Sequence, residues 1–347
     1  MTQTTVTASQ LTEMVAGILR HQGLPPEDAD FVAASLVEAD LRGVHSHGVL
    51  RLPRYARELR EQITNPRPQI RVLDEGPAWA RVDGDGGMGP LVGRYAMQVG
   101  IAKALSAGSA VVTACRSRHF GSAGFYALMA AERGLIGMAM TVASPRLAPT
   151  GGKQPLFGNN PISLAVPGDQ QFPLLVDFAA GRTGAGRLEL AAASGQSIPE
   201  GLARDLDGNP TTDPAVGLAG AIVPIGEHKG YGLTLMIEVL AGLLGGAPYF
   251  GVGRAQVAEH MRGKGIGHFF MVIDPARFMP LPQFKAAVSR MAAGIKRSPC
   301  SPGVDEIMVP GEPEARLRRE RLEAGIPMAA STMSRLRQLA TECGLQV

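Results

Sequence analysis

Helical spacing of apolar residues marks both ends of this chain, and it limits the architecture more than any other feature. The first helix follows Ser9, which can cap it, and carries apolar residues three or four positions apart. A second helix is expected from Pro26 to about Gly43, and a third over about residues 53–60. The tail over about residues 313–345 is expected to be helical again.

Between these ends, short apolar strands alternate with helices. Strands are expected at 70–72, 78–82, 109–114, 136–142, 162–166, 174–176 and 268–273. Helices are expected at about 90–107, 123–133 and 229–244. This order predicts an α/β fold in which the helices of both chain ends pack together as a lobe.

Composition excludes several classes of protein. Hydrophobic residues make up 45% of the 347 residues and charged residues 19%, which excludes a disordered chain. The chain also has 44 Gly and 26 Pro, about a fifth of the total against roughly 12% on average, so it is rich in turns.

Charge says little about the protein's partners, whereas the cysteines and the N-terminus favour a cytoplasmic protein. The net charge is +3, and the Arg-rich stretch near the C-terminus alternates with Glu, as on a solvated helix face, so no nucleic acid is expected. Three cysteines without metal spacing favour a reducing compartment. The most apolar window, residues 233–247, is too short for a bilayer and carries Glu238, and the N-terminus lacks a signal peptide, so no membrane partner is expected.

A glycine fingerprint between a strand and a helix suggests a dinucleotide site. Gly84, Gly86 and Gly89 have the G-x-G-x-x-G spacing. That site also needs an acidic residue about 20 positions later, whereas the first one after Asp85 is Glu132. A glycine-rich connection is therefore favoured over a Rossmann site.

A group of polar residues after the second helix could bind the carboxylate of a substrate and move a proton to or from that substrate. Arg51 can hold a carboxylate with two parallel hydrogen bonds, Ser46 and Tyr55 can add neutral ones, and His47 can move a proton near neutral pH. His45 and His47 do not share a helix face, which excludes a helical metal clamp. The alternative is a polar loop at a helix junction.

Two further segments are candidates for the same site. His119 follows a strand of small and β-branched residues, where site residues of α/β proteins often lie, although a capping or surface histidine has the same pattern. Lys229 and Gly230 begin an apolar helix, so an ammonium and free backbone N–H groups would meet at its positive end, as suits a phosphate. The alternative is an ordinary glycine-rich helix entry.

Taken together, these segments resemble the type 2 malate/L-lactate dehydrogenase family, which includes ureidoglycolate, sulfolactate and diketogulonate oxidoreductases and piperideine-2-carboxylate reductases. The resemblance runs from the first helix to the tail. Its markers are Ser46–Val49 with Arg51 and Tyr55, Val82–Gly87, His119–Gly121, Gly151–Gly152, Gly158–Pro161, Asp177 with Ala179, Pro210–Pro214, His228–Gly232 and Val309–Glu312.

The resemblance implies a fold and an assembly. The family binds NAD(P) on a non-Rossmann, largely antiparallel mixed sheet, and it forms dimers with the active site at a cleft. Residues 1–65 plus 280–347 would then form the helical lobe, and residues 66–279 the NAD(P)-binding and substrate α/β domain. We accordingly expect a homodimer.

The resemblance also implies a set of site residues. His119 and His47 would be catalytic, and Ser46, Arg51 and Tyr55 would bind the substrate. Cofactor contacts carry over to Ser144, Asn160, Asp177, Phe178, Ala179, Lys229, Gly230, Gly311, Glu312 and Pro313. No metal is expected, because hydride chemistry belongs to the cofactor.

The sequence departs from the family at two places near the cofactor. Asp177–Gly181 lacks both hydroxyls of the common Asp-Met-Ala-Thr-Ser pattern, and residues 182–186 are smaller and more flexible than usual. Asn159 replaces a frequent Thr. These departures leave the choice open between NAD and NADP.

The residues and the resemblance together predict an NAD(P)-dependent oxidoreductase that interconverts a 2-hydroxy acid and a 2-oxo acid, malate- or lactate-like, with NAD the first choice and NADP possible. One alternative keeps the fold and reduces a cyclic imine such as piperideine-2-carboxylate with NADPH, since Pro155–Gly158 resembles those reductases. The other is a non-catalytic dinucleotide-binding protein, suggested by the altered 180–187 segment.

Overall fold

The computed structural model describes residues 3–247 and 256–345. Its centre is a seven-stranded sheet with the strand order β2 (Arg71–Gly76), β3 (Trp79–Asp83), β4 (Ser109–Ser117), β13 (Ile266–Ile273), β5 (Ile136–Thr141), β8 (Pro161–Val166) and β9 (Leu174–Ala179). Only β3 and β4 pair in parallel, and the other neighbours are antiparallel. The expected α/β class with a largely antiparallel mixed sheet is therefore confirmed.

Helices cover both faces of this sheet. α4 (Gly89–Ala107) and α5 (Ala123–Ala131) pack on one face, where Phe270 and Val272 of β13 belong to a core shared with these helices. Phe269 and Met271, which alternate with Phe270 and Val272 along β13, pack in a second core with α8 (His228–Ile237) and the π-helix η3 (Glu238–Leu243). Successive side chains of a strand point to opposite faces, so α8 and η3 lie on the far side of the sheet.

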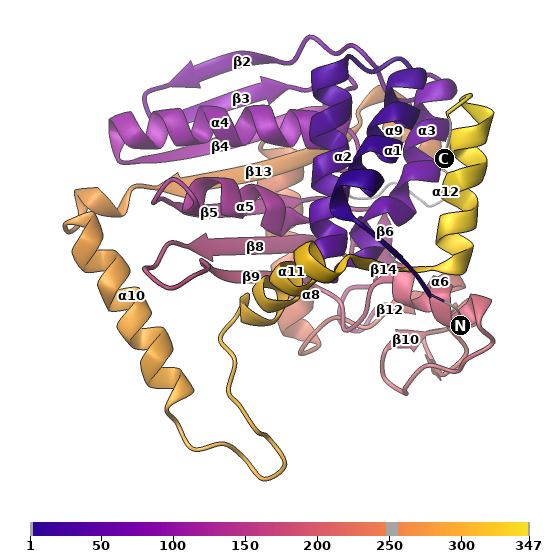
Figure 1. Ribbon diagram of the computed structural model, residues 1–347. Helices are drawn as coiled ribbons and strands as arrows, with labels where there is room; N and C mark the ends of the chain where they lie inside the picture. The colour runs from indigo at the N-terminus through magenta and orange to yellow at the C-terminus, as the bar shows by residue number, and fades with distance from the viewer. Residues whose placement is uncertain (1–2, 248–255, 346–347) are drawn as a thin grey trace.

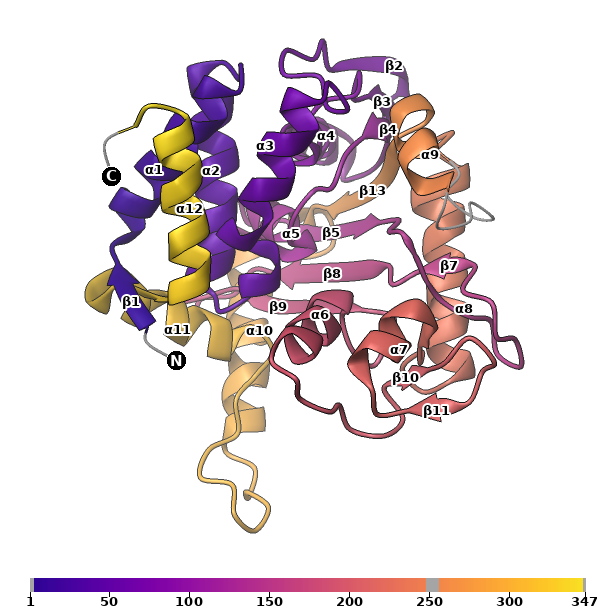
Figure 2. The same ribbon diagram turned by 90° about the vertical axis from the view of Figure 1, so that its right-hand side faces the viewer.

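Helices from both chain ends share a third core. It joins α1 (Ala8–His21), α2 (Pro26–Leu41) and α3 (Leu52–Arg60) to α12 (Ala330–Glu342), and Figure 2 shows α12 beside α1 and α3. β1 (Gln3–Val6) pairs antiparallel with β14 (Ile326–Ala329), so the N-terminus is tied directly to the C-terminal region. The division into two domains at the stated residues stays a prediction.

A smaller unit lies beside the main sheet. Its five short strands have the order β11 (Pro210–Thr211), β10 (Ala203–Arg204), β12 (Ala221–Ile222), β6 (Pro145–Leu147) and β7 (Phe157–Gly158). α6 (Ala185–Ala193) and α7 (Pro214–Ala219) pack with these strands around Leu147, Leu188 and Ile222. α10 (Leu281–Lys296) extends away from the body before the chain returns to α11 (Glu312–Ala324), as Figure 1 shows.

Three local expectations need correction. The first helix is capped by Thr7, whose hydroxyl accepts a hydrogen bond from the Gln10 N–H at 3.2 Å while the Gln10 side chain bonds back to the Thr7 N–H. This capping box outcompetes Ser9 because it satisfies two backbone donors. The tail is not one helix, since β14 interrupts it, and the helix expected over 229–244 becomes a π-helix from Glu238.

Within residues 3–247 and 256–345, no helix is both long enough and apolar enough to cross a membrane.

Candidate active site

The turn between α2 and α3, together with the start of α3, carries four of the predicted site residues. It consists of two short 3-10 helices, η1 (His45–His47) and η2 (Val49–Arg51), and Tyr55 follows on the first turns of α3. Gly48 separates the two short helices, and a Cβ there would lie within 2.3 Å of the Asp40 carboxylate. The glycine is therefore required for the turn to pack against α2.

His119 lies in the loop between β4 and α5. The start of α4 presses against this loop: a Cβ at Gly89 would lie 2.4 Å from the carbonyl oxygens of Arg118 and His119. Gly84 and Gly86 donate backbone hydrogen bonds to Cys115 and Arg116, at 2.9 and 2.7 Å. The glycine fingerprint thus fixes the segment that carries His119.

The structure brings both histidines and the tyrosine together. The imidazole rings of His47 and His119 stack with centroids 5.7 Å apart and planes 15° apart. The Tyr55 hydroxyl lies 2.8 Å from Nδ1 of His119, and the Ser46 hydroxyl lies 2.9 Å from Nδ1 of His47. Nε of Arg51 donates to the Ser46 carbonyl at 2.5 Å. Five residues from two distant segments therefore form one cluster.

Burial and nearby cations keep both histidines neutral. Burial lowers the pKa of His47 to about 4, and Arg51 adds to the shift. Burial also lowers the pKa of His119 well below its ordinary value, with contributions from Arg54, His47 and Arg51. Burial raises the pKa of the Tyr55 hydroxyl strongly, so this group stays protonated. The cluster therefore contains two neutral bases beside a guanidinium.

α6 contributes a wall that the sequence did not reveal. A Cβ at Gly186 would lie 3.3 Å from Nη2 of Arg51 and 3.6 Å from Cβ of Ser46. Glu189, one helical turn later, is the acidic residue that most raises the pKa of Arg51, whereas burial lowers it more. Residues three apart share a helix face. The departures from the family at residues 182–186 drew attention to this segment, but they did not indicate that it contacts Arg51.

Most of the predicted cofactor residues surround β9, the edge strand of the main sheet. A Cβ at Gly311 would lie 2.8 Å from Cβ of Leu175, and the Leu175 N–H donates to the Pro310 carbonyl at 3.1 Å. At the other end of β9, a Cβ at Gly230 would lie 2.6 Å from the Ala180 carbonyl oxygen. Val176, Asp177 and Phe178 between these ends are exposed.

Asp177 connects this strand to the histidine cluster. Its carboxylate accepts hydrogen bonds from the Ser122 hydroxyl at 2.8 Å and the Gly124 N–H at 2.9 Å. Both donors lie at the start of α5, within five residues of His119. Although the residue as a whole is exposed at the sheet edge, its carboxylate lies against the start of α5, and the loss of water around that group raises the pKa of Asp177 above its ordinary value.

The backbone expectation at the start of α8 is wrong. The N–H groups of Lys229 and Gly230 are not free, because they donate to the carbonyls of Gly226 and Ile225 at 3.1 and 2.7 Å. The tight turn at Gly226 uses these donors before a ligand could. Lys229 itself is exposed, and its ammonium has no ion-pair or hydrogen-bond partner among the described residues.

Two predicted cofactor residues use their side chains inside the protein. Asn160 is fully buried: its oxygen accepts from the Ala143 N–H at 2.7 Å and its nitrogen donates to Glu238 at 3.0 Å, which holds the loop that leads to Ser144. The Glu312 carboxylate binds Lys296 and Arg316, each at 2.5 Å. Pro313 next to it is exposed. Direct contact of these residues with a cofactor stays a prediction.

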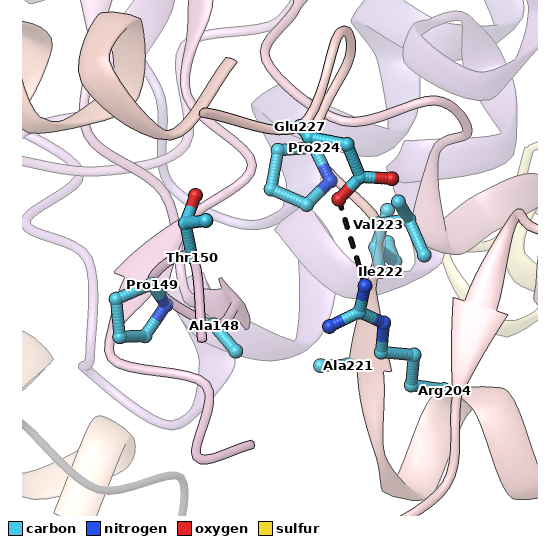
Figure 3. A pocket seen from close by; sticks show the side chains of 9 residues that line it. All are labelled: Ala148, Pro149, Thr150, Arg204, Ala221, Ile222, Val223, Pro224 and Glu227. Carbon is cyan, nitrogen blue, oxygen red and sulfur yellow. Dashed lines mark ion pairs between the residues drawn. The ribbon is translucent and has the colours of Figure 1, made fainter. Parts of the chain in front are cut away.

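Two hollows elsewhere contain none of the predicted site residues. The one in Figure 3, between residues 148–150 and 221–227, holds about 10 Å³ and is closed on one side by an Arg204–Glu227 ion pair at 3.5 Å. This is room for about one water molecule. The other lies at the end of α3 and in the loop that follows this helix, beside Arg60 and Arg118. Neither contacts the histidine cluster.

In the part of the chain that the structure describes, no group of three or more His, Cys, Asp or Glu side chains is arranged to hold a metal ion.

Comparison with known proteins identifies the family. A model of the malate/L-lactate dehydrogenase family matches residues 6–337. The chain belongs to this family. It is a hydroxy acid dehydrogenase, an oxidoreductase acting on CH–OH that uses a nicotinamide cofactor. The predicted family and enzyme class are confirmed.

Individual relatives cover nearly the whole chain. Malate dehydrogenase of Pyrococcus horikoshii is 41% identical over 98% of this chain and 96% of its own length, and its solved structure matches with a TM-score of 0.90 over 99% and 97% of the two chains. L-sulfolactate dehydrogenase of Methanocaldococcus jannaschii is 37% identical over 96% of both chains. Ureidoglycolate dehydrogenase (NAD(+)) of Escherichia coli K12 is 32% identical over 92% of this chain and 91% of its own.

Proposed function

We propose that this dehydrogenase transfers a hydride between NAD and a small 2-hydroxy acid, malate- or lactate-like, at the cluster of His47, Arg51, Tyr55 and His119. The observation that carries the proposal is the combination of a partly buried guanidinium with two stacked, neutral imidazoles. The guanidinium can bind the substrate carboxylate, and a neutral imidazole can accept the hydroxyl proton. NAD is preferred because the E. coli relative is named for it.

The residues around β9 fit a dinucleotide. Exposed Phe178 offers an aromatic face at the sheet edge, and Lys229 offers a cation that no described residue neutralises. We assign the cofactor to Asp177, Phe178 and Ala179, with Ser144, Lys229, Gly230 and the Gly311–Pro313 turn around it. Bound there, NAD supplies the hydride acceptor and NADH the donor. The non-Rossmann binding mode belongs to this same proposal.

The side chains have distinct roles in the reaction. Arg51 binds the substrate carboxylate and thereby orients C2, with the Ser46 hydroxyl beside it. In oxidation, His119 accepts the hydroxyl proton, and in reduction it returns that proton to the new alkoxide. His47 is the other candidate for this proton transfer.

Tyr55 sets which nitrogen of His119 carries the proton. Its oxygen lies 2.8 Å from Nδ1 and 3.3 Å from the His119 carbonyl. When the hydroxyl donates to the carbonyl, Nδ1–H can donate to the tyrosine oxygen, which leaves Nε2 as a proton acceptor. Once Nε2 has accepted the substrate proton, His119 is an imidazolium that donates from Nε2 in the reverse direction, while its Nδ1–H stays bonded to the tyrosine oxygen. The same contact therefore serves both directions of the reaction.

The run that suggested a cyclic-imine reductase has a packing role. Phe157 and Gly158 form β7, and Phe157 is buried with its ring centroid 5.4 Å from that of Tyr231. These residues support the small sheet, so the Pro155–Gly158 pattern favours the imine less than it did in the sequence.

We also propose a homodimer. η3 and the end of α8 expose Met236, Val239 and Leu243, which recur at helical spacing away from the sheet. Contiguous apolar surface of this kind is typical of a protein interface. A second copy of this chain would cover it.

A substrate panel tests the reaction. Malate, L-lactate, sulfolactate and piperideine-2-carboxylate would each be measured with the NAD and NADP couples through nicotinamide absorbance, and we expect the highest kcat/KM with a hydroxy acid and NAD. His119→Ala should lower that value about 10²–10⁴-fold. His21→Ala, an exposed histidine of α1, is the matched control and should change nothing.

Three results would contradict these assignments. A preference for the imine with NADPH would replace the substrate, and NADH binding without turnover of any compound would indicate a non-catalytic protein. Full activity of the His119 variant would remove that residue from the mechanism.

A further inference from the structure

A buried carboxylate that the reaction itself does not use lies against residues 45–51, the catalytic turn formed by η1 and η2. Asp40, on the last turn of α2, is 1% exposed. One of its oxygens lies 2.7 Å from Nδ1 of His45, and the other accepts the Val49 N–H at 2.7 Å. Its two oxygens thus bind one residue of η1 and one of η2, on either side of Gly48.

A residue from the far end of the sequence completes this arrangement. Nη1 of Arg321, on α11, donates to the Asp40 carbonyl oxygen at 2.5 Å and lies 3.0 Å from Nε2 of His45. A guanidinium has only donors, so Nε2 must offer a lone pair and the His45 proton must sit on Nδ1, where it is donated to Asp40. The chain of contacts runs without a break from α11 to the catalytic turn.

The Asp40 carboxylate contacts the backbone between His47 and Arg51. His47 lies two residues before Val49 and Arg51 two residues after it, so the Val49 N–H is the midpoint of the segment that carries the proton-transfer candidate and the carboxylate anchor. A 3-10 turn this short has few backbone hydrogen bonds of its own: His47 N–H to Val44, Gly48 N–H to His45 and Arg51 N–H to Gly48. The Asp40 carboxylate adds two contacts that bridge η1 and η2.

We propose that Asp40 and Arg321 are positioning residues of the active site, which fix the placement of His47 and Arg51 through His45 and Val49. A buried charge is costly unless its partners satisfy it, and here both hydrogen-bond partners of the carboxylate, His45 and Val49, belong to the catalytic turn. The inference rests on the proposed reaction, because that reaction assigns roles to His47 and Arg51.

The same two helices offer a matched control. Arg318, one turn before Arg321 on α11, binds Glu38 of α2 with its Nε at 2.8 and 3.0 Å from the two carboxylate oxygens. This ion pair joins α11 to α2 as Arg321 does, but it does not reach η1 or η2. A difference between the two arginines therefore separates positioning of the turn from docking of the helix.

The experiment compares Arg321→Ala and Arg318→Ala with the full-length wild type in steady-state kinetics and thermal unfolding. Arg321→Ala should raise the KM for the hydroxy acid about tenfold and lower kcat by a smaller factor, as expected when one hydrogen-bonded contact is lost. Arg318→Ala should leave KM and kcat within twofold of the wild-type values. Its Tm should change by about as much as that of Arg321→Ala. Arg321→Lys, which can still reach the Asp40 carbonyl, should recover part of the loss in KM.

Equal kinetic effects of the two alanine variants would overturn the inference. An Arg321→Ala enzyme with a lowered Tm but unchanged KM and kcat would overturn it as well. Asp40→Asn provides a second variant if Arg321→Ala does not fold, and unchanged KM in a folded Asp40→Asn enzyme would overturn it as well. A wild type that oxidises no hydroxy acid would refute the proposed function instead, so the two failures are distinguishable.

Discussion

His119 and His47 each have one ring nitrogen in contact with a neighbouring hydroxyl, from Tyr55 and Ser46. The hydroxyl orients the ring, while burial and nearby cations oppose its protonation. A proton acceptor that stays neutral far below pH 7 is available over the whole physiological range. The cost is a weaker base, since basicity falls with the pKa.

This environment predicts the pH profile of hydroxy acid oxidation. An unperturbed histidine would lose half of its base form at about pH 6.5, but the lowered pKa values shift that loss to more acid pH. We expect kcat/KM for oxidation to stay level down to pH 6 and to fall only below it. The profile would be measured at constant ionic strength, with unfolding monitored at each pH, and an acid limb at pH 6.5 or above in folded enzyme would contradict the assignment.

At the scale of elements, α6 and the 180–187 segment form one wall of the site. Two departures from the family meet there: the Asn159 side chain accepts the Gly181 N–H at 2.7 Å and donates to the Thr183 carbonyl at 2.8 Å. A Cβ at Gly181 would lie 2.8 Å from that same Asn159 oxygen. The amide at 159 and the glycine at 181 therefore belong to one contact, which holds the segment that leads into α6.

Gly186→Val tests this wall. Because even a Cβ would lie 3.3 Å from Arg51, the branched side chain should displace the guanidinium and raise the KM for the substrate at least tenfold, with a smaller effect on kcat. Tm should change little, since the glycine is only partly buried. Gly184→Ala is the control, because nothing lies within 4 Å of its Cβ position. Equal kinetics in the two variants would place Arg51 away from α6.

At the scale of the whole molecule, the site residues come from three parts: the helices of the chain ends, the main sheet with its loops, and the smaller unit beside it. The turn after α2 and the start of α3 supply His47, Arg51 and Tyr55, the loop after β4 supplies His119, and the main sheet and the smaller unit supply β9 and α6. Movement of one unit against another would therefore change the site directly.

The apolar surface of η3 predicts the assembly state. Leu243, 56% exposed, should be covered by a second copy, so Leu243→Glu should shift the protein from dimer to monomer in size-exclusion chromatography with light scattering. Leu105→Glu, on an exposed leucine of α4, should leave the dimer intact. A wild-type monomer would contradict the proposal.

Periodicity and short motifs are local, so the amino-acid sequence was enough to predict the alternation of strands and helices, the family and the residues that form the cluster. It also identified the glycine fingerprint at 84–89 as a connection, since the acidic residue that a Rossmann site needs was missing. Contacts between distant segments were not accessible in this way. Three contacts became visible only in the folded chain: Tyr55 meets His119, Gly186 lies against Arg51, and Arg321 reaches Asp40 across 281 positions of the sequence. These contacts depend on how helices and sheets pack, and side-chain spacing along one segment carries no information about its neighbour in space.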